Sequence, residues 1–147
     1  LKLKNQLEKF NKKYAKTEDQ LIEDYARRYQ WKMAKTSTGL RYWVYKKQNG
    51  KKPQPLDKVT INYTVNLING VVVYDSKTDG QKTVVLGRST AESGLEEGLY
   101  MMTIGEKAKL IIPSHLAFGL LGDENKIPQR ATLIYDLEIV NIHSNNH

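Results

Sequence analysis

The side chains that could perform acid-base, metal or nucleophilic chemistry are few in this sequence. Three histidines occur, at positions 115, 143 and 147, and two of them lie in a polar C-terminal segment. Cysteine is absent, which removes thiol nucleophiles, disulfides and cysteine-based metal sites. Asp123, Glu124 and Asn125 resemble part of a calcium loop, but the other ligand positions of such a loop are missing. We therefore predict no metal and no cofactor.

Two adjacent carboxylates, Glu96 and Glu97, have the residue type for general acid-base work. The surrounding pattern places Leu95 and Leu99 on one face of a short helix over residues 94–102, with both glutamates outside that face. In the first turn of a helix, negative charges also interact favourably with the helix dipole. We interpret the pair as solvated helix charges.

The remaining candidates are aromatic side chains accompanied by one acid. Tyr63 lies on the apolar face of a predicted strand, and Tyr74 with Asp75 ends the next one. Phe118 lies in a long loop that contains several glycines. Taken alone, such rings are more often core than pocket lining, so both interpretations stay open at this stage.

Length and charge limit the classes of protein that this chain can belong to. Its 147 residues fit one domain with a short appendage, and no apolar run approaches the ~20 residues of a membrane span. Residues 1–16 hold six Lys against one Glu, whereas residues 36–147 hold 13 basic against 11 acidic residues. A basic lead on a nearly neutral domain is typical of a stalk near an anionic membrane or of a solvated helix face. We expect no nucleic-acid binding, because the lead carries no recognised motif.

The first third of the sequence has helical periodicity. A lysine-rich helix is predicted over residues 2–13. It continues into the next helix or meets a partner chain, and the alternative is a frayed or disordered segment. Thr17 and Gln20 form a predicted capping box, which would begin a second helix that reaches Met33.

Alternation of apolar and polar residues begins near residue 37 and indicates antiparallel strands. The predicted strands cover residues 40–45, 59–67, 71–75, a segment ending at 86, 108–112 and 133–139. Asn69-Gly70 predicts a hairpin with a type I′ turn, in which both central residues need positive φ.

These elements predict an α+β domain in which an antiparallel sheet wraps around one short helix. We divide the chain into a basic N-terminal helical extension (1–36), the domain itself (37–143) and a polar tail (144–147).

Several segments, in this order, resemble the FKBP family of peptidyl-prolyl cis-trans isomerases. They are VTINYTVNLINGVVVYDSK, VVLG, SGLEEGLYMMTIGEKAKLIIPSHLAFG and KIPQRATLIYDLEIVNI. The resemblance covers about residues 39–142. The preceding TSTGLRYWVYKKQNGKKP and the charged helix are similar to the macrophage-infectivity-potentiator and gliding-motility-associated members, which are bacterial envelope proteins that often carry a lipid anchor.

The resemblance implies a client-binding pocket and assigns residues to it. It gives the catalytic positions to Tyr63, Asp75 and Phe118, where Phe118 replaces the usual tyrosine. It gives substrate-binding positions to Tyr74, Ala91, Glu92, Leu95, Ile127 and Tyr135.

Three departures from the family pattern affect this pocket. Ala91 and Glu92 stand where Val-Ile is usual, and Leu95 stands where the pocket floor is usually Trp. The segment between Asp75 and Leu86 is shorter than the family norm, so the usual wall aromatic cannot be placed.

The implied function is rotation of X-Pro bonds in unfolded or partly folded clients, which assists folding in the cell envelope. The alternative is a weakly active or inactive chaperone or binding module on the same fold. The resemblance also implies a periplasmic or outer-membrane location, macrolide inhibition, a dimer through the N-terminal helices and a lipid anchor upstream of residue 1.

Overall fold

A computed structural model describes residues 2–88 and 90–144, and the chain divides into two compact units, Leu1–Lys32 and Met33–His147. The boundary between the units lies at residues 32 and 33, whereas the N-terminal extension is predicted to end at residue 36. The boundary is earlier because β1 (Ala34–Lys35) pairs antiparallel with β2 (Arg41–Lys46) and so belongs to the sheet. Residues 145–147 of the predicted tail, His147 included, lie outside the described residues.

The first unit is a single helix, α1 (Lys2–Arg28). The predicted capping box is wrong, because the Thr17 hydroxyl donates back to the Lys13 carbonyl (3.0 Å) from inside the helix. Continuation of the lysine-rich segment into the next helix is confirmed, since α1 runs through both. The helix also ends before Met33, since Gln30 adopts a φ of 58°, which an α-helix does not accommodate.

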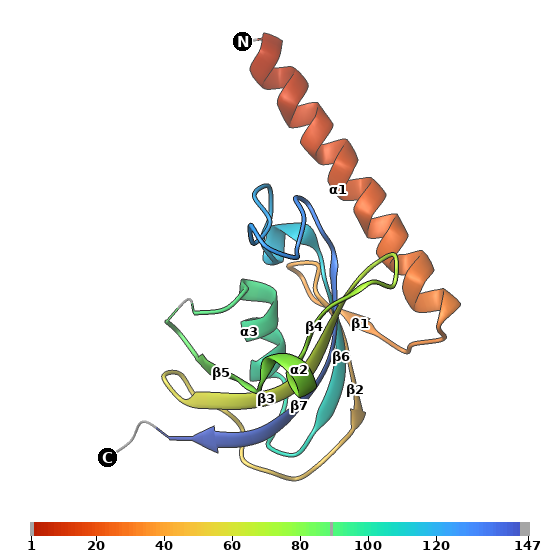
Figure 1. Ribbon diagram of the computed structural model, residues 1–147. Coiled ribbons are helices and arrows are strands. Elements are labelled where there is room, and N and C mark those ends of the chain that lie inside the picture. The colour runs from red at the N-terminus through yellow and green to blue at the C-terminus, as the bar shows by residue number, and fades with distance from the viewer. Residues whose placement is uncertain (1, 89, 145–147) are drawn as a thin grey trace. The chain divides into compact units, whose positions relative to one another are not determined.

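The second unit is built on a 7-stranded antiparallel sheet with the order β1-β2-β6-β7-β3-β4, and β5 also pairs with β3 (Figure 1). Its remaining elements are β3 (Lys58–Leu67), β4 (Val72–Asp75), α2 (Ser76–Asp79), β5 (Lys82–Val85), α3 (Ser93–Tyr100), β6 (Lys107–Ile112), the 3-10 helix η1 (Ser114–Leu116) and β7 (Leu133–His143). All predicted strands are present. The three short elements β1, α2 and η1 were not predicted.

The β3-β4 hairpin forms where Asn69-Gly70 predicts it, but with a different turn. Gly70 has a φ of 92°, whereas Asn69 is not among the described residues with positive φ, which excludes type I′. The Gly70 N–H donates to the Leu67 carbonyl (2.9 Å), and the Asn69 side chain accepts from the Val71 N–H (3.1 Å). A single left-handed glycine therefore closes this turn.

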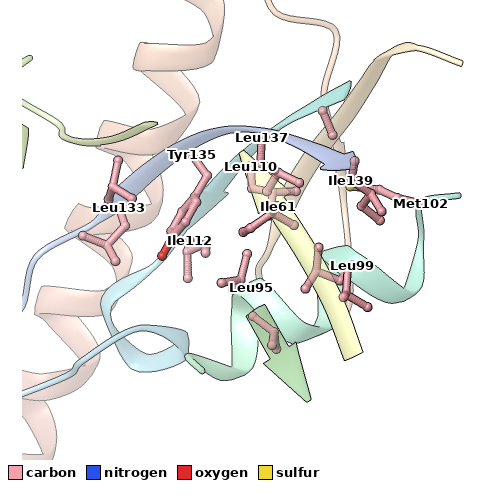
Figure 2. Close-up of a cluster of buried hydrophobic side chains, with 14 of the residues drawn as sticks. Ile61, Leu95, Leu99, Met102, Leu110, Ile112, Leu133, Tyr135, Leu137 and Ile139 are labelled. Carbon is pink, nitrogen blue, oxygen red and sulfur yellow. The ribbon is translucent and has the colours of Figure 1, made fainter. Parts of the chain in front are cut away.

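The core lies between α3 and the concave face of the sheet (Figure 2). Leu95 and Leu99 of α3 are fully buried against strand residues such as Ile61 and Leu110. Gly98 lets the helix approach β6, because a Cβ added there would lie 2.6 Å from Leu110 Cδ1. The predicted sheet wrapped around one short helix is confirmed.

The interpretation of Glu96 and Glu97 as solvated charges is wrong. Glu96 Oε1 accepts from the Gly87 N–H (2.5 Å), and Glu97 Oε1 accepts from the Thr38 hydroxyl (2.7 Å). The two carboxylates therefore connect α3 to the loop that follows β5 and to the loop between β1 and β2. Only Glu96 lies in the first turn of α3.

Candidate functional site

A cavity of about 370 Å³ opens at one end of the core of the second unit. It is lined by four aromatic rings, two aliphatic side chains and three polar residues. The rings are Tyr63, Tyr74, Phe118 and Tyr135, the aliphatic residues are Val65 and Ile127, and the polar residues are Gln81, Lys82 and Asp123. Strands β3, β4, β5 and β7 and the long segment between β6 and β7 all contribute, so the sheet must be complete before the cavity exists.

Tyr63 occupies β3 between the buried residues Ile61 and Val65. Its own ring is half-buried and lines the cavity. Burial raises the pKa of its hydroxyl, and the carboxylates of Asp79 and Asp75 raise it further. The phenol therefore stays protonated at neutral pH and is available as a hydrogen-bond donor.

Tyr74 and Asp123 join β4 to the loop on the other side of the cavity. The Tyr74 hydroxyl donates to Asp123 Oδ2, and Asp123 Oδ1 accepts from the N–H groups of Asn125 (2.9 Å) and Ile127 (2.7 Å). Burial alone would raise the pKa of Asp123, but these hydrogen bonds outweigh burial and lower it. The carboxylate therefore folds the loop and fixes one wall residue, Ile127.

Tyr135, Glu92 and Lys82 form a second polar group at the wall. The Tyr135 hydroxyl donates to Glu92 Oε2, and Lys82 Nζ lies 3.4 Å from Glu92 Oε1. Burial raises the pKa of Tyr135 well above its usual value, and the negative charge of Glu92 adds to this effect. The Tyr135 ring itself is packed within the buried cluster (Figure 2).

Phe118 is held in the cavity by the turn that follows η1. The Ser114 carbonyl accepts from the N–H groups of Ala117 (3.1 Å) and Gly119 (2.9 Å), on either side of Phe118. Gly122, farther along, has a φ of 67°, and a Cβ there would lie 2.3 Å from the Ile127 carbonyl oxygen. Glycine at position 122 is therefore required for the loop to close beside the cavity.

Five of the residues that the resemblance assigned to the pocket line this cavity, and Glu92 contacts two lining residues. The five are Tyr63, Tyr74, Phe118, Ile127 and Tyr135. Leu95 is fully buried in the core and does not line the cavity. Ala91 packs against the core cluster beside α3 and also lies outside the lining.

Asp75 is placed differently from the other predicted residues. Its carboxylate caps α2 by accepting from the Lys77 N–H (2.9 Å), and it lines a separate cleft of about 420 Å³. Tyr63 lines both that cleft and the aromatic cavity. Asp75 thus lies on the side of Tyr63 that faces the separate cleft, and its charge contributes to the raised pKa of the Tyr63 phenol.

Sequence reasoning missed four cavity residues: Val65, Gln81, Lys82 and Asp123. Lys82 follows α2, in the segment whose length differs from the family pattern, so nothing in the sequence placed it. Asp123 was considered only as a calcium ligand, although an Asx residue two positions before Asn125 is a known loop-folding signal.

The cavity contains no nucleophile paired with a base. Within residues 2–88 and 90–144, no group of three His, Asp or Glu side chains is arranged to hold a metal ion. The site presents rings, two aliphatic walls and hydrogen-bond donors, which suits binding of an apolar ring next to a polar backbone.

None of the helices in the described part of the chain combines the length and apolarity needed to cross a bilayer.

Comparison with known proteins gives consistent matches. Residues 49–140 match the family model of the FKBP-type peptidyl-prolyl cis-trans isomerases. A probable FKBP-type peptidyl-prolyl cis-trans isomerase FkpA from Neisseria meningitidis is 37% identical over 107 residues, which cover 73% of this chain and 39% of that protein. Peptidyl-prolyl cis-trans isomerase FPR2 of Saccharomyces cerevisiae is 38% identical over 95 residues, 63% of this chain and 70% of that protein.

The crystal structure of FkpA from Escherichia coli superposes with a TM-score of 0.76 at 32% identity, covering 93% of this chain and 64% of that one. A peptidyl-prolyl cis-trans isomerase structure from Pseudomonas syringae has the same TM-score at 21% identity, which shows a shared fold. The chain spans about 39% of the length of the Neisseria FkpA protein. From the family match and the shared architecture, this chain belongs to the FKBP-type peptidyl-prolyl cis-trans isomerase family.

Proposed function

We propose that this protein catalyses cis-trans isomerisation of X-Pro bonds in protein clients. The observation that supports this most strongly is the cavity lined by four rings, Val65 and Ile127, without a nucleophile and base. Family membership supports the same activity. Its clients are proline-containing segments of unfolded or partly folded proteins.

The chemistry requires no covalent step. Rotation about an X-Pro bond crosses a barrier of ~18–20 kcal/mol, because twisting breaks amide resonance. The twisted amide is less polar than the planar one, so a pocket that binds the pyrrolidine ring and excludes water favours it. The rings of Tyr63, Tyr74 and Phe118 supply such surroundings, and the protonated Tyr63 hydroxyl is placed to donate to a client carbonyl.

Exchange between cis and trans Ala-Leu-Pro-Phe, measured by NMR, tests this activity. We expect Tyr63→Ala and Phe118→Ala each to lower kcat/KM by about tenfold or more, equivalent to ~1.4 kcal/mol of transition-state stabilisation. Trp43→Ala is the control, since the Trp43 ring contacts the Tyr45 ring at a tilted angle and lines neither cleft. Absence of any catalysed exchange by the wild-type protein contradicts the proposal.

Asp75 has two proposed roles that one pair of variants separates. Asparagine caps helices about as well as aspartate, so Asp75→Asn keeps the cap of α2 and removes only the charge. If the charge acts on the reaction through Tyr63, Asp75→Asn lowers kcat/KM while the melting temperature stays unchanged. If Asp75 only caps, Asp75→Ala loses stability and Asp75→Asn retains full activity.

A client-holding role is a second candidate, favoured by exposed apolar residues beside the cavity. Leu121 is 73% exposed, and with Leu67 it lines an open groove that shares Ile127 with the aromatic cavity. Leu120 and Val72 are exposed as well. A longer apolar client segment could therefore bind next to its proline.

Leu121→Ser tests this second role separately from catalysis. We expect weaker binding of a reduced, unfolded protein, by several-fold, with unchanged exchange in the short peptide, which does not reach the groove. Glu124→Gln, in the same groove, is the polar control. Unchanged affinity for unfolded protein in Leu121→Ser contradicts the holding role.

We also propose that the protein acts in the bacterial envelope, in the periplasm or at the outer membrane. The identity to bacterial FkpA proteins and the basic N-terminal segment support this location. Dimerisation through α1, a lipid anchor upstream of residue 1 and macrolide inhibition remain predictions from the resemblance.

A further inference from the structure

A buried ion pair stands at the wall of the aromatic cavity. Lys82 Nζ lies 3.4 Å from Glu92 Oε1, and the Tyr135 hydroxyl donates to the other carboxylate oxygen. The side chain of Glu92 is 1% exposed, whereas that of Lys82 is 33% exposed. The carboxylate of the pair is therefore enclosed by protein, whereas Lys82 is partly exposed and lines the cavity.

Stability alone does not account for this pair. Removing a carboxylate from water costs several kcal/mol, and well-packed apolar side chains often replace a buried ion pair without loss of stability. Glu92 also precedes α3 without making a capping hydrogen bond, so its carboxylate does not serve the helix. The carboxylate accepts from the Tyr135 hydroxyl and holds the Lys82 ammonium, which belongs to a residue that lines the aromatic cavity.

The two charged groups that line the cavity differ in what they can still bind. Asp123 accepts from Tyr74, Asn125 and Ile127, so both of its oxygens are occupied. The Lys82 ammonium has three N–H donors. Among residues 2–88 and 90–144, it donates to one acceptor, Glu92 Oε1. The remaining donors suit a carboxylate brought in by a client.

We propose that Lys82, held in place by Glu92, makes the cavity selective for clients with an acidic side chain next to the proline. This inference rests on the proposed function, because it assumes that the proline ring occupies the cavity. In a partly buried site the ammonium-carboxylate contact is expected to give a preference of roughly three- to tenfold for Glu over isosteric Gln.

Two pairs of peptides test the proposal, Ala-Glu-Pro-Phe-Ala against Ala-Gln-Pro-Phe-Ala, and Ala-Phe-Pro-Glu-Ala against Ala-Phe-Pro-Gln-Ala. NMR titration gives the Kd ratio for each pair, and exchange spectroscopy gives the kcat/KM ratio. We expect the wild-type protein to prefer Glu in at least one pair, and the preference to shrink as salt is added.

Variants at the two charges should move the ratio in opposite directions. Lys82→Met removes the ammonium and should abolish the preference, whereas Glu92→Gln releases the ammonium from its partner and should increase it. Lys82→Met alone leaves the buried Glu92 carboxylate unpaired and could fold poorly for that reason. The double variant, Lys82→Met with Glu92→Gln, removes both charges and avoids this problem. Its Glu-to-Gln preference ratio should be close to one. Lys47→Met, an exposed change of the same net charge, should keep the wild-type ratio.

A wild-type protein without preference for Glu in either pair overturns the inference, and so does a preference that survives in the double variant. Catalysed exchange without the preference rejects the role of Lys82 and leaves the isomerase intact. A Kd preference that depends on Lys82 in a protein without catalysed exchange supports the role of Lys82 and rejects the isomerase.

Discussion

At the scale of single residues, Asp123 organises more of the site than any ring in it. One carboxylate oxygen accepts from Tyr74 on β4, and the other accepts from backbone N–H groups within its own loop. These bonds lower its pKa below the ordinary value of 3.8, although burial opposes them. A group with a depressed pKa stabilises the fold above its ordinary pKa, and this stabilisation is lost as the pH falls through the folded-state pKa.

Asp123→Asn should therefore destabilise the protein at pH 7 by about 1–2 kcal/mol, because the charge-assisted hydrogen bonds become neutral ones. At pH 2 more of the wild-type carboxyl is protonated than at pH 7, so the difference between the two proteins should be smaller. Urea unfolding at both pH values measures it. Glu124→Gln removes one negative charge at the neighbouring position and serves as control. If Asp123→Asn lowered the free energy of unfolding equally at both pH values, the role of Asp123 would be contradicted.

The residues that the resemblance assigned to the pocket differ in where they lie. Tyr63 and Tyr135 lie on strands with apolar alternation and line the aromatic cavity, whereas Leu95 is buried in the core. Lys82 begins a strand after α2, a helix of four residues that the sequence pattern did not reveal. Its pairing with Glu92 depends on that register and therefore could not be predicted.

At the scale of elements, the contact between α3 and β6 limits what can replace glycine. Gly98→Ala should destabilise the domain by roughly 1–3 kcal/mol, because the new methyl group would meet Leu110, and this outweighs the ~1 kcal/mol gain in helix propensity. Shortening the opposing side chain in Gly98→Ala with Leu110→Val should restore part of the loss. Thermal unfolding of both single variants and the double variant measures the coupling, and strict additivity would contradict the close contact.

Element boundaries were predicted less well than the elements themselves. Thr17 has the residue type of a helix cap, yet its hydroxyl bonds to the preceding turn and the helix runs on, because nothing in α1 interrupts it before Gln30. Asn69-Gly70 identified the hairpin but not its turn type, which depends on the φ of a single residue. Local signals of this kind allow several geometries, and tertiary packing selects one of them.

At the scale of the whole molecule, the second compact unit contains all the elements that form the cavity. All strands and the complete cavity lie within residues 33–147. We expect this fragment to fold alone and to isomerise short peptides at a rate within about twofold of the full chain, measured by far-UV circular dichroism and NMR exchange. An unfolded or inactive fragment would contradict this prediction. The overall architecture was predictable because alternating strands, one amphipathic helix and several family segments all agree on it.

The arrangement of β7 has a consequence for the order of biosynthesis. This strand pairs with β6 on one side and with β3 on the other, from Lys58↔His143 to Leu67↔Leu133 with one register shift between Thr60 and Ile61. It is also the last element of the domain to leave the ribosome. A nascent chain therefore cannot close its sheet until translation of the domain is complete, so the pairing that joins β6 to β3 is made last.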